Sequence, residues 1–283
     1  MASQREIRRR IASVRNIKQI TRAMQFVAAS KLKRAQDATI AARPYSETLE
    51  EVLADVASVL GREEHPLLTQ RDGDRRCLVV FTTDRPLAGA LNTNVVRFAA
   101  AEIVNHPGDL AVVAIGRKGR DALRRMRVPI VAFFLNYGDR PAFSDVLPLA
   151  RLITDDYLSG AYDRVDLVYP EFVSTLTQRP VLETLLPIHP SGDTRGIPGN
   201  QFLFEPSPGA VLEQLLPRYV AVRVFQAVLE SAASEQSSRM VAMKNATENA
   251  EELIDDLTLT YNKVRQANIT SEMIEIASGA QAL

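Results

Sequence analysis

The placement of proline and glycine constrains this chain more than any other feature of its sequence. All 15 prolines lie between Pro44 and Pro217, and 12 of the 13 glycines lie between Gly61 and Gly209. Residues 218–278 therefore contain neither of the two helix-breaking residue types. As one helix rising about 1.5 Å per residue, this stretch would be roughly 90 Å long. Such a length is typical of a coiled coil or a rod.

Both ends of the chain carry an amphipathic helical pattern. Residues 3–6, Ser-Gln-Arg-Glu, form a capping box, in which the two polar side chains satisfy backbone N–H groups at a helix start. Apolar residues then recur every three or four positions, which keeps one helical face apolar. The N-terminal stripe consists of Ile7, Ile11, Val14, Ile17, Ile20, Met24 and Val27, and the C-terminal stripe of Met240, Met243, Ala246, Ala250, Leu253, Leu257, Tyr261 and Val264. These patterns predict two helical arms, with Gly279 as a C-terminal stop.

The middle of the chain alternates between strand and helix patterns. Apolar runs typical of buried strands occupy residues 76–84, 110–116, 128–134 and 164–172. Helical segments lie between them, at 117–126, at 149–162 and in a helix capped near Asn92. Such alternation with short connections predicts a small, mostly parallel sheet covered by helices. The expected fold is α/β: an N-terminal coiled-coil helix (1–60), a Rossmann-like α/β domain with an irregular C-terminal part (61–207), and a C-terminal coiled-coil helix and tip (208–283).

The two arms have opposite charge although the whole chain has a formal net charge of zero. Residues 1–34 contain ten basic side chains against one acid, and residues 230–275 contain nine acids against four bases. Arms that leave the same domain must run antiparallel, and aligning its ends makes paired residue numbers add up to about 270. Met24 is then expected near Ala246. Surface ion pairs contribute only about 0–1 kcal/mol each, so charge sets the register while apolar burial stabilises the pair.

The same alignment leaves the end of the C-terminal arm without a partner helix from about Ile269 onwards. This end is apolar at Ile269, Met273, Ile274, Ile276 and Leu283. A lone helix with exposed apolar residues predicts a binding sleeve supplied by another protein.

Motifs for catalysis and cofactor binding are missing from the sequence. It has no GxxxxGK[ST] phosphate loop, no GxGxxG after a strand and no GxSxG nucleophile elbow. The three histidines are scattered, and Cys77 lies within a predicted strand, where a buried thiol is inert. No window of about 18 apolar residues predicts a membrane span, and the N-terminus lacks the apolar region of a secretory signal. We expect no catalytic residues, no bound metal and no cofactor of the chain's own.

The basic N-terminal arm leaves a second function class open. A basic coiled-coil adaptor or nucleic-acid-binding protein would also place cations at a helix start. Against this alternative, the cations share their helix with a continuous apolar stripe, and no aromatic residues interleave for base stacking. With a net charge of zero, the chain also lacks the broad positive field that a non-specific DNA-binding protein uses.

Several long segments resemble one known family. They are IRRRIASVRNIKQITRAMQFVAASKLKRAQ (7–36), RPYSETL (43–49), TTDRPLAGALN (82–92), FLFEPSP (202–208) and residues 234–283 almost throughout. Together they resemble the gamma subunit of F-type, proton-translocating ATP synthases, over both arms and the ends of the middle domain. The resemblance implies an essential but non-catalytic rotor shaft that couples proton flow to ATP synthesis or hydrolysis.

The resemblance also implies partners and a location. The coiled coil would turn inside a ring of alpha and beta subunits, with the α/β domain near the epsilon subunit and the c-ring. ATP, ADP and Mg²⁺ would be bound by the alpha and beta subunits. The complex would place this chain at the cytoplasmic face of a bacterial plasma membrane, as a peripheral subunit without a transmembrane segment.

Residue roles implied by the resemblance fall into two groups. Positions linked to coupling and to contacts with beta-subunit acidic loops are Met24, Arg239, Arg265, Gln266 and Thr270. Positions in the region that meets the c-ring are Phe202, Phe204 and Glu205. Arg and Gln suit contacts with acidic loops, because charge-assisted hydrogen bonds can break and re-form as a shaft turns.

Overall fold

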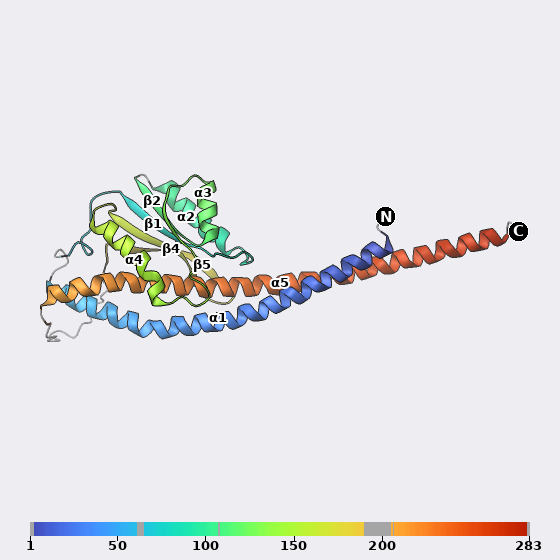
Figure 1. The fold of residues 1–283 in the computed structure, drawn as a ribbon, viewed down its shortest axis with the longest axis horizontal. Coiled ribbons are helices and arrows are strands. Elements are labelled where there is room, and N and C mark those ends of the chain that lie inside the picture. The colour runs from blue at the N-terminus through green and yellow to red at the C-terminus, as the bar shows by residue number, and fades with distance from the viewer. Residues whose placement is uncertain (1–2, 61–64, 107, 190–204, 206, 282–283) are drawn as a thin grey trace. The chain divides into compact units, whose positions relative to one another are not determined.

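The computed structural model describes residues 3–60, 65–106, 108–189, 205 and 207–281 of the 283-residue chain. Its two longest elements are α1 (Gln4–Leu60) and α5 (Pro208–Gln281), with 57 and 74 residues (Figure 1). The chain divides into two compact units, and both helices contribute to each of them. The helix-pair unit contains Met1–Ala28 and Arg239–Leu283, and the domain unit contains Ala29–Ser238.

The domain unit contains a five-stranded sheet in the order β3-β2-β1-β4-β5. The strands are β1 (Arg76–Phe81), β2 (Leu110–Ile115), β3 (Ile130–Phe134), β4 (Arg164–Phe172) and β5 (Gln178–Leu186). Strands β3, β2, β1 and β4 are parallel to one another, and β5 pairs with β4 in the antiparallel direction. The connecting helices are α2 (Leu91–Asn105), α3 (Arg117–Arg125) and α4 (Phe143–Leu158). The predicted fold, two helical arms around a small, mostly parallel sheet, is confirmed.

Helices cover both faces of this sheet: residues of α2 and α3 pack on one face, and residues of α4, α1 and α5 pack on the other. Leu78 and Val80 of β1 face α2 and α3, where they pack in one cluster with Val95 and Leu123. Val79 on the opposite face belongs to a larger cluster with residues of α4 and of the domain-unit parts of α1 and α5. Because a parallel strand is buried on both faces, β1 is a continuous apolar run in the sequence.

Two predicted helix starts had different outcomes. The backbone N–H of Glu6 donates to Ser3 Oγ at 3.3 Å, which confirms the capping serine at the start of α1. The helix predicted near Asn92 is α2, which begins at Leu91; its N-cap position is Ala90 without a side-chain cap bond, and Asn92 is its second residue. The Asn92 side chain instead accepts the Thr83 N–H at 3.0 Å and donates to Thr83 Oγ1 at 2.9 Å. These bonds fasten the end of β1 to the helix that follows it.

Candidate functional site: the helix pair and its unpaired end

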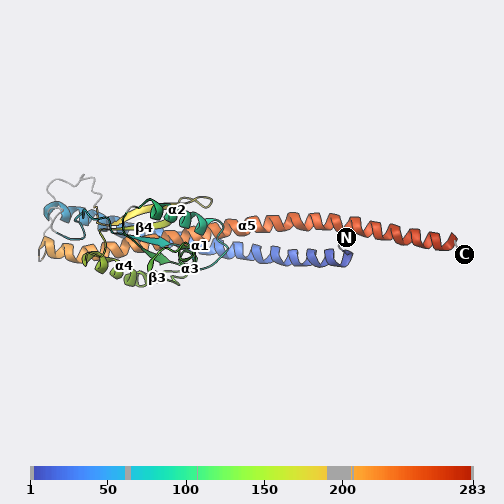
Figure 2. The same ribbon diagram turned by 90° about the horizontal axis from the view of Figure 1, so that it is seen from above.

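In the helix-pair unit, α1 and α5 lie side by side and antiparallel (Figures 1 and 2). Three polar contacts define their register: Gln4 with Tyr261 at 3.0 Å, Lys18 with Glu251 at 2.7 Å, and Thr21 with Thr247 at 2.8 Å. Each partner lies within about five residues of the position that the sequence predicts, which is within the error expected for such an alignment. The predicted antiparallel pairing is confirmed.

The buried seam between these helices differs in detail from the predicted stripes. Ile17, Ile20 and Val27 were expected in the seam, but they are 50%, 59% and 54% exposed. The seam instead uses the small residues Thr21 and Ala28, because two paired helices meet along a narrow repeat of 3.5 residues. On α5 the predicted Leu253 is exposed, and the half-buried Ile254 lies in the seam instead. These four stripe predictions are wrong.

The correction leaves an exposed apolar strip on α1. Met24 is half-buried at the border of the seam, and Ile20 and Val27 flank it one turn before and one turn after. An apolar strip beside a polar helix face is a surface that another protein can cover. The structure thus places the predicted contact residue Met24 at the edge of such a surface.

The end of α5 continues beyond the first residues of α1. Arg265, Gln266 and Thr270 all lie on this exposed end, which is helical throughout its described length. The Thr270 hydroxyl donates to the Gln266 backbone carbonyl at 2.9 Å, so the Gln266 side-chain amide is not used in that bond. Ile269, Met273 and Ile276 follow at helical spacing and are 48%, 66% and 73% exposed.

The spacing gathers these side chains on one side of the helix end. Residues three or four apart share a helical face, so Gln266, Thr270 and Met273 are neighbours, as are Arg265 and Ile269. We call residues 265, 266, 269, 270, 273 and 276 the tip surface. It combines an apolar stripe with a cation and an amide, the groups suited to an apolar sleeve with acidic edges.

The remaining predicted site residues lie elsewhere. Arg239 is on α5 at the start of its helix-pair segment and is only 8% exposed. Glu205 is exposed, immediately before α5. Phe202 and Phe204 lie outside the described residues. The structure therefore groups Arg265, Gln266 and Thr270, and separates them from Met24 and Arg239.

Charge complements charge across the helix pair. The Lys18 ammonium donates a hydrogen bond to Glu251 and, with a smaller contribution from the charge of Arg22, lowers the pKa of that carboxyl. The pair is exposed, so its role is to favour this register over others rather than to add much stability.

The carboxyl edge of the parallel strands is where doubly wound folds usually bind ligands. Here Asp84 follows β1, and its carboxylate accepts the N–H groups of Arg117 at 2.9 Å and of Asn136 at 2.8 Å. The cavity at this edge measures about 50 Å³, and Val228, Ser231 and other α5 residues line it. A space of this size holds a water molecule or two, and a nucleotide does not fit.

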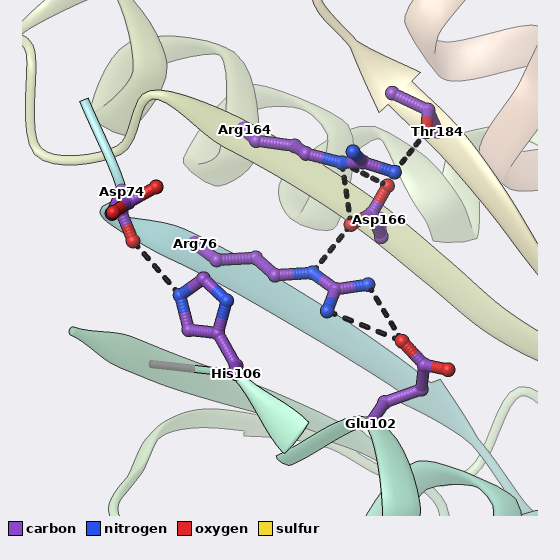
Figure 3. Close-up of polar contacts among 7 residues, drawn as sticks. All are labelled: Asp74, Arg76, Glu102, His106, Arg164, Asp166 and Thr184. Carbon is purple, nitrogen blue, oxygen red and sulfur yellow. Dashed lines mark hydrogen bonds and ion pairs between the residues drawn. The ribbon is translucent and has the colours of Figure 1, made fainter. Parts of the chain in front are cut away.

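The amino edge of the sheet carries a polar cleft of about 540 Å³. Figure 3 shows its central network, in which Asp166 of β4 accepts bonds from Arg76 at 2.6 Å and from Arg164 at 2.9 Å. Arg76 also donates to Glu102 of α2, and Arg164 donates to Thr184 of β5. Asp166 is fully buried, and a buried carboxylate needs such partners. The network braces β1, β4, β5 and α2, and its charges compensate one another.

Reactive groups are accounted for within the described part of the chain. Burial raises the pKa of the Cys77 thiol to about 12, so this cysteine is inert at neutral pH. Among those same residues, no cluster of three or more His, Cys, Asp or Glu side chains could hold a metal ion. Long paired helices with an inserted α/β domain and an exposed tip define a class of protein that acts through contacts with other subunits.

Comparison with known sequences identifies the family within this class. The family described as ATP synthase matches residues 3–283. The ATP synthase gamma chain of Dehalococcoides mccartyi strain BAV1 is 48% identical over 287 residues, covering 100% of both chains. That of Roseiflexus castenholzii is 48% identical over 291 residues, covering 100% of this chain and 99% of the other. The chain belongs to the ATP synthase gamma chain family, and its members are non-catalytic stalk subunits.

Solved structures share the fold. One neighbour belongs to the Euglena gracilis mitochondrial ATP synthase, OSCP/F1/c-ring, in rotational state 3. It has a TM-score of 0.68 and 22% identity, covering 99% of this chain and 94% of that chain. A chain from the central stalk and c-ring of the Tetrahymena thermophila enzyme has a TM-score of 0.63 and 24% identity, covering 80% of this chain and 99% of the other.

Proposed function

We propose that this chain is the central rotor shaft of an F-type ATP synthase and couples proton flow to ATP synthesis or hydrolysis. The observation that carries the proposal is the tip surface, an exposed mixture of apolar and polar residues at the end of a 74-residue helix. An isolated helix end with this composition gains stability only inside a partner's sleeve. Membership of the gamma chain family supports the ring of alpha and beta subunits as that sleeve.

The mechanism follows from the asymmetry of the shaft. The pair has α1 on one side of α5 only, so its surface has no threefold symmetry. Three beta subunits around such a shaft would each meet a different surface at any moment. Rotation would pass each surface to the next beta subunit in turn, and each catalytic site would bind, convert and release its nucleotide in sequence. ATP, ADP and Mg²⁺ would stay on the alpha and beta subunits.

The contact residues are proposed from their placement. Arg265, Gln266 and Thr270 on the tip surface would meet acidic beta-subunit loops through hydrogen bonds that can be exchanged during rotation. Met24 would join them through the exposed strip that Ile20 and Val27 extend. Arg239 is buried, so we propose that it supports coupling from within the helix pair.

The other partners would bind at the opposite end of α5. The region of Phe202, Phe204 and Glu205 would contact the c-ring, with the epsilon subunit nearby. In the described part of the chain, no helix combines the length and apolar character needed to cross a membrane. We propose a peripheral position at the cytoplasmic face of a bacterial plasma membrane, held there by the complex.

The nucleic-acid alternative is not supported. The match to the ATP synthase family extends over residues 3–283, including the acidic arm that a DNA-binding protein would not need. Several cations of the basic arm also have acidic partners: Arg10 with Glu6, Lys18 with Glu251, Lys31 with Asp139, and Lys33 with Asp37.

Reconstitution with matching alpha and beta subunits tests the proposal. The full chain is expected to assemble and stimulate ATP hydrolysis, and removal of residues 269–283 is expected to reduce that stimulation about tenfold. A sharper version compares Ile269→Asp with Ser271→Asp, because these neighbours occupy opposite faces of one exposed helix. Only the first should impair stimulation. Equal behaviour of the two variants, or a folded full chain that fails to assemble, would contradict the shaft proposal.

A further inference from the structure

The segment of α5 between Glu230 and Ser238 is unusually polar for a buried helix. Ser234 and Ser237 are 0% exposed, and Gln236 is 4% exposed. Burying a hydroxyl or an amide is unfavourable unless it is hydrogen-bonded, so these side chains need partners. The identity of those partners shows what the segment does.

The serines of this segment bond outward to other parts of the domain unit. Ser234 Oγ donates to the Pro170 carbonyl at 2.8 Å. Ser237 Oγ donates to the Thr175 carbonyl, and Ser238 Oγ to the Ala88 carbonyl, both at 2.7 Å. The acceptors belong to three separate segments: β4, the turn between β4 and β5, and the loop between β1 and α2.

Outward bonding contrasts with the other hydroxyl residues of α5. Helical Ser and Thr commonly donate to the carbonyl four residues earlier in their own helix. Ser231, Thr258, Thr260 and Thr270 do so, and Thr247 does so while also contacting Thr21 of α1. Ser234, Ser237 and Ser238 instead donate to carbonyls outside α5, and all three lie close together on this helix. Their hydroxyl groups are thus used for attachment between segments.

A second group extends this attachment to α1. Asp139, in the loop between β3 and α4, accepts a hydrogen bond from Lys31 of α1 at 2.6 Å. Its other oxygen accepts from Gln236 of α5 at 3.4 Å. The Arg85 guanidinium, from the loop after β1, lies 3.9 Å from the Asp139 carboxylate. One carboxylate of the α/β domain therefore contacts both long helices.

A further bond strengthens the attachment at its start. The Phe172 N–H, at the end of β4, donates to Glu230 at 2.9 Å. Burial raises the pKa of this carboxyl, and the Phe172 bond lowers it in part. We call Ser234, Ser237, Ser238, Lys31 and Asp139 the clasp.

We propose that the clasp is the joint through which torque passes between the α/β domain and the two long helices; this inference rests on the rotor function proposed above. Apolar packing is non-directional, so a helix held only by apolar contacts can roll or slide against a sheet. Hydrogen bonds require a defined direction and distance, and they weaken steeply when either changes. Bonds to four separate segments fix the rotation of the helices relative to the domain.

The test uses the complete reconstituted synthase in lipid vesicles. A variant combining Ser234→Ala, Ser238→Ala and Asp139→Ala removes contacts to β4, to the loop after β1 and to both helices. We expect ATP-driven proton uptake per ATP hydrolysed to fall about threefold or more, because directed bonds hold the joint. Hydrolysis itself should stay within about twofold of the unmodified complex, since the tip surface is unchanged.

Matched controls separate the joint from general damage. Ser231→Ala removes a hydroxyl that bonds within α5, and Asp37→Ala removes an exposed ion pair within α1. Both should keep the uptake-to-hydrolysis ratio of the unmodified complex, and Asp139→Glu should restore part of what Asp139→Ala loses. A clasp variant with the same ratio as these controls overturns the proposal.

Two further outcomes are also decisive. If the combined variant does not fold, Ser238→Ala and Asp139→Asn are measured singly. A ratio of proton uptake to ATP hydrolysis equal to that of the controls would again overturn the proposal. Hydrogen exchange of the full chain should show faster exchange at residues 230–238 in every clasp variant, and unchanged exchange would contradict the proposal. A failure of the unmodified chain to couple hydrolysis to uptake would instead overturn the rotor function itself.

Discussion

Every residue of β1 is buried, whereas the first 28 residues of α1 bury only Ile7, Ile11 and Ala28. The domain unit encloses two apolar clusters, one on each face of its sheet, beneath helices. The helix-pair unit has a single seam and leaves Ile17, Ile20 and Val27 in contact with solvent. The domain unit therefore supplies its own core, while the helix-pair unit is built to gain further burial from other subunits.

The same contrast extends to polar groups. In the domain unit, buried Asp166 has two arginine partners, and the clasp serines bond to carbonyls of distant segments. In the helix-pair unit, polar contacts such as Lys18–Glu251 lie at the surface. A rotating shaft benefits from this division, because a rigid joint and an adaptable contact surface need different chemistry.

The largest expected effect comes from removing equivalent leucines from the two units. Leu167 of β4 is fully buried, so Leu167→Ala should lower the free energy of unfolding by about 2–5 kcal/mol through lost burial and a cavity. Leu257→Ala in the half-buried seam should cost about 1 kcal/mol. Denaturant unfolding with hydrogen exchange resolved by unit measures both. Equal losses would mean that the helix pair is packed as densely as the domain.

A second comparison tests close packing within the domain unit. Gly116 has a φ of +85°, and a Cβ added there would lie 2.2 Å from the Thr82 carbonyl oxygen. Gly138 has a φ of +71°, but its nearest atom to such a Cβ is 4.0 Å away. Gly116→Ala should cost about 3 kcal/mol or more and Gly138→Ala about 1 kcal/mol, since only the first adds a clash to backbone strain. Thermal unfolding would contradict this if the two losses were equal.

The smallest expected effect concerns the surface pair of the helix-pair unit. Lys18→Met removes the hydrogen bond that lowers the pKa of Glu251, so this pKa should return toward its ordinary value of 4.5. A lowered folded-state pKa adds stability above that ordinary value, and the contribution is lost as pH falls through the folded-state pKa. Carboxyl NMR titration of the full chain measures the change.

Lys244→Met is the matched control, because Lys244 lies 3.8 Å from Glu248 within α5 and does not join the two helices. It should leave the titration of Glu251 unchanged. If Lys18→Met also left that titration unchanged, the charge complementarity between the arms would have no part in their register.

Much of this architecture is predictable because its signals are local. The absence of proline and glycine from residues 1–43 and 218–278 predicts long helices, and the opposite charges of the two arms predict antiparallel pairing. The contacts Lys18–Glu251 and Thr21–Thr247 confirm that register. The exposed tip follows from the same reasoning, since an alignment of unequal arms must leave one end unpaired. The individual contact roles of Met24, Arg239, Arg265, Gln266 and Thr270 stay predictions.

Other features depend on distances between segments far apart in the chain, and only the tertiary structure decides them. Periodicity alone predicted Ile17 and Ile20 in the seam. In the structure they are exposed, and the smaller Thr21 and Ala28 lie between the two closely packed helices. The sequence does not distinguish the serines near residue 234 from serines that bond within their own helix. Their outward bonds to β4 and its neighbours exist because the folded domain brings those carbonyls within 2.8 Å.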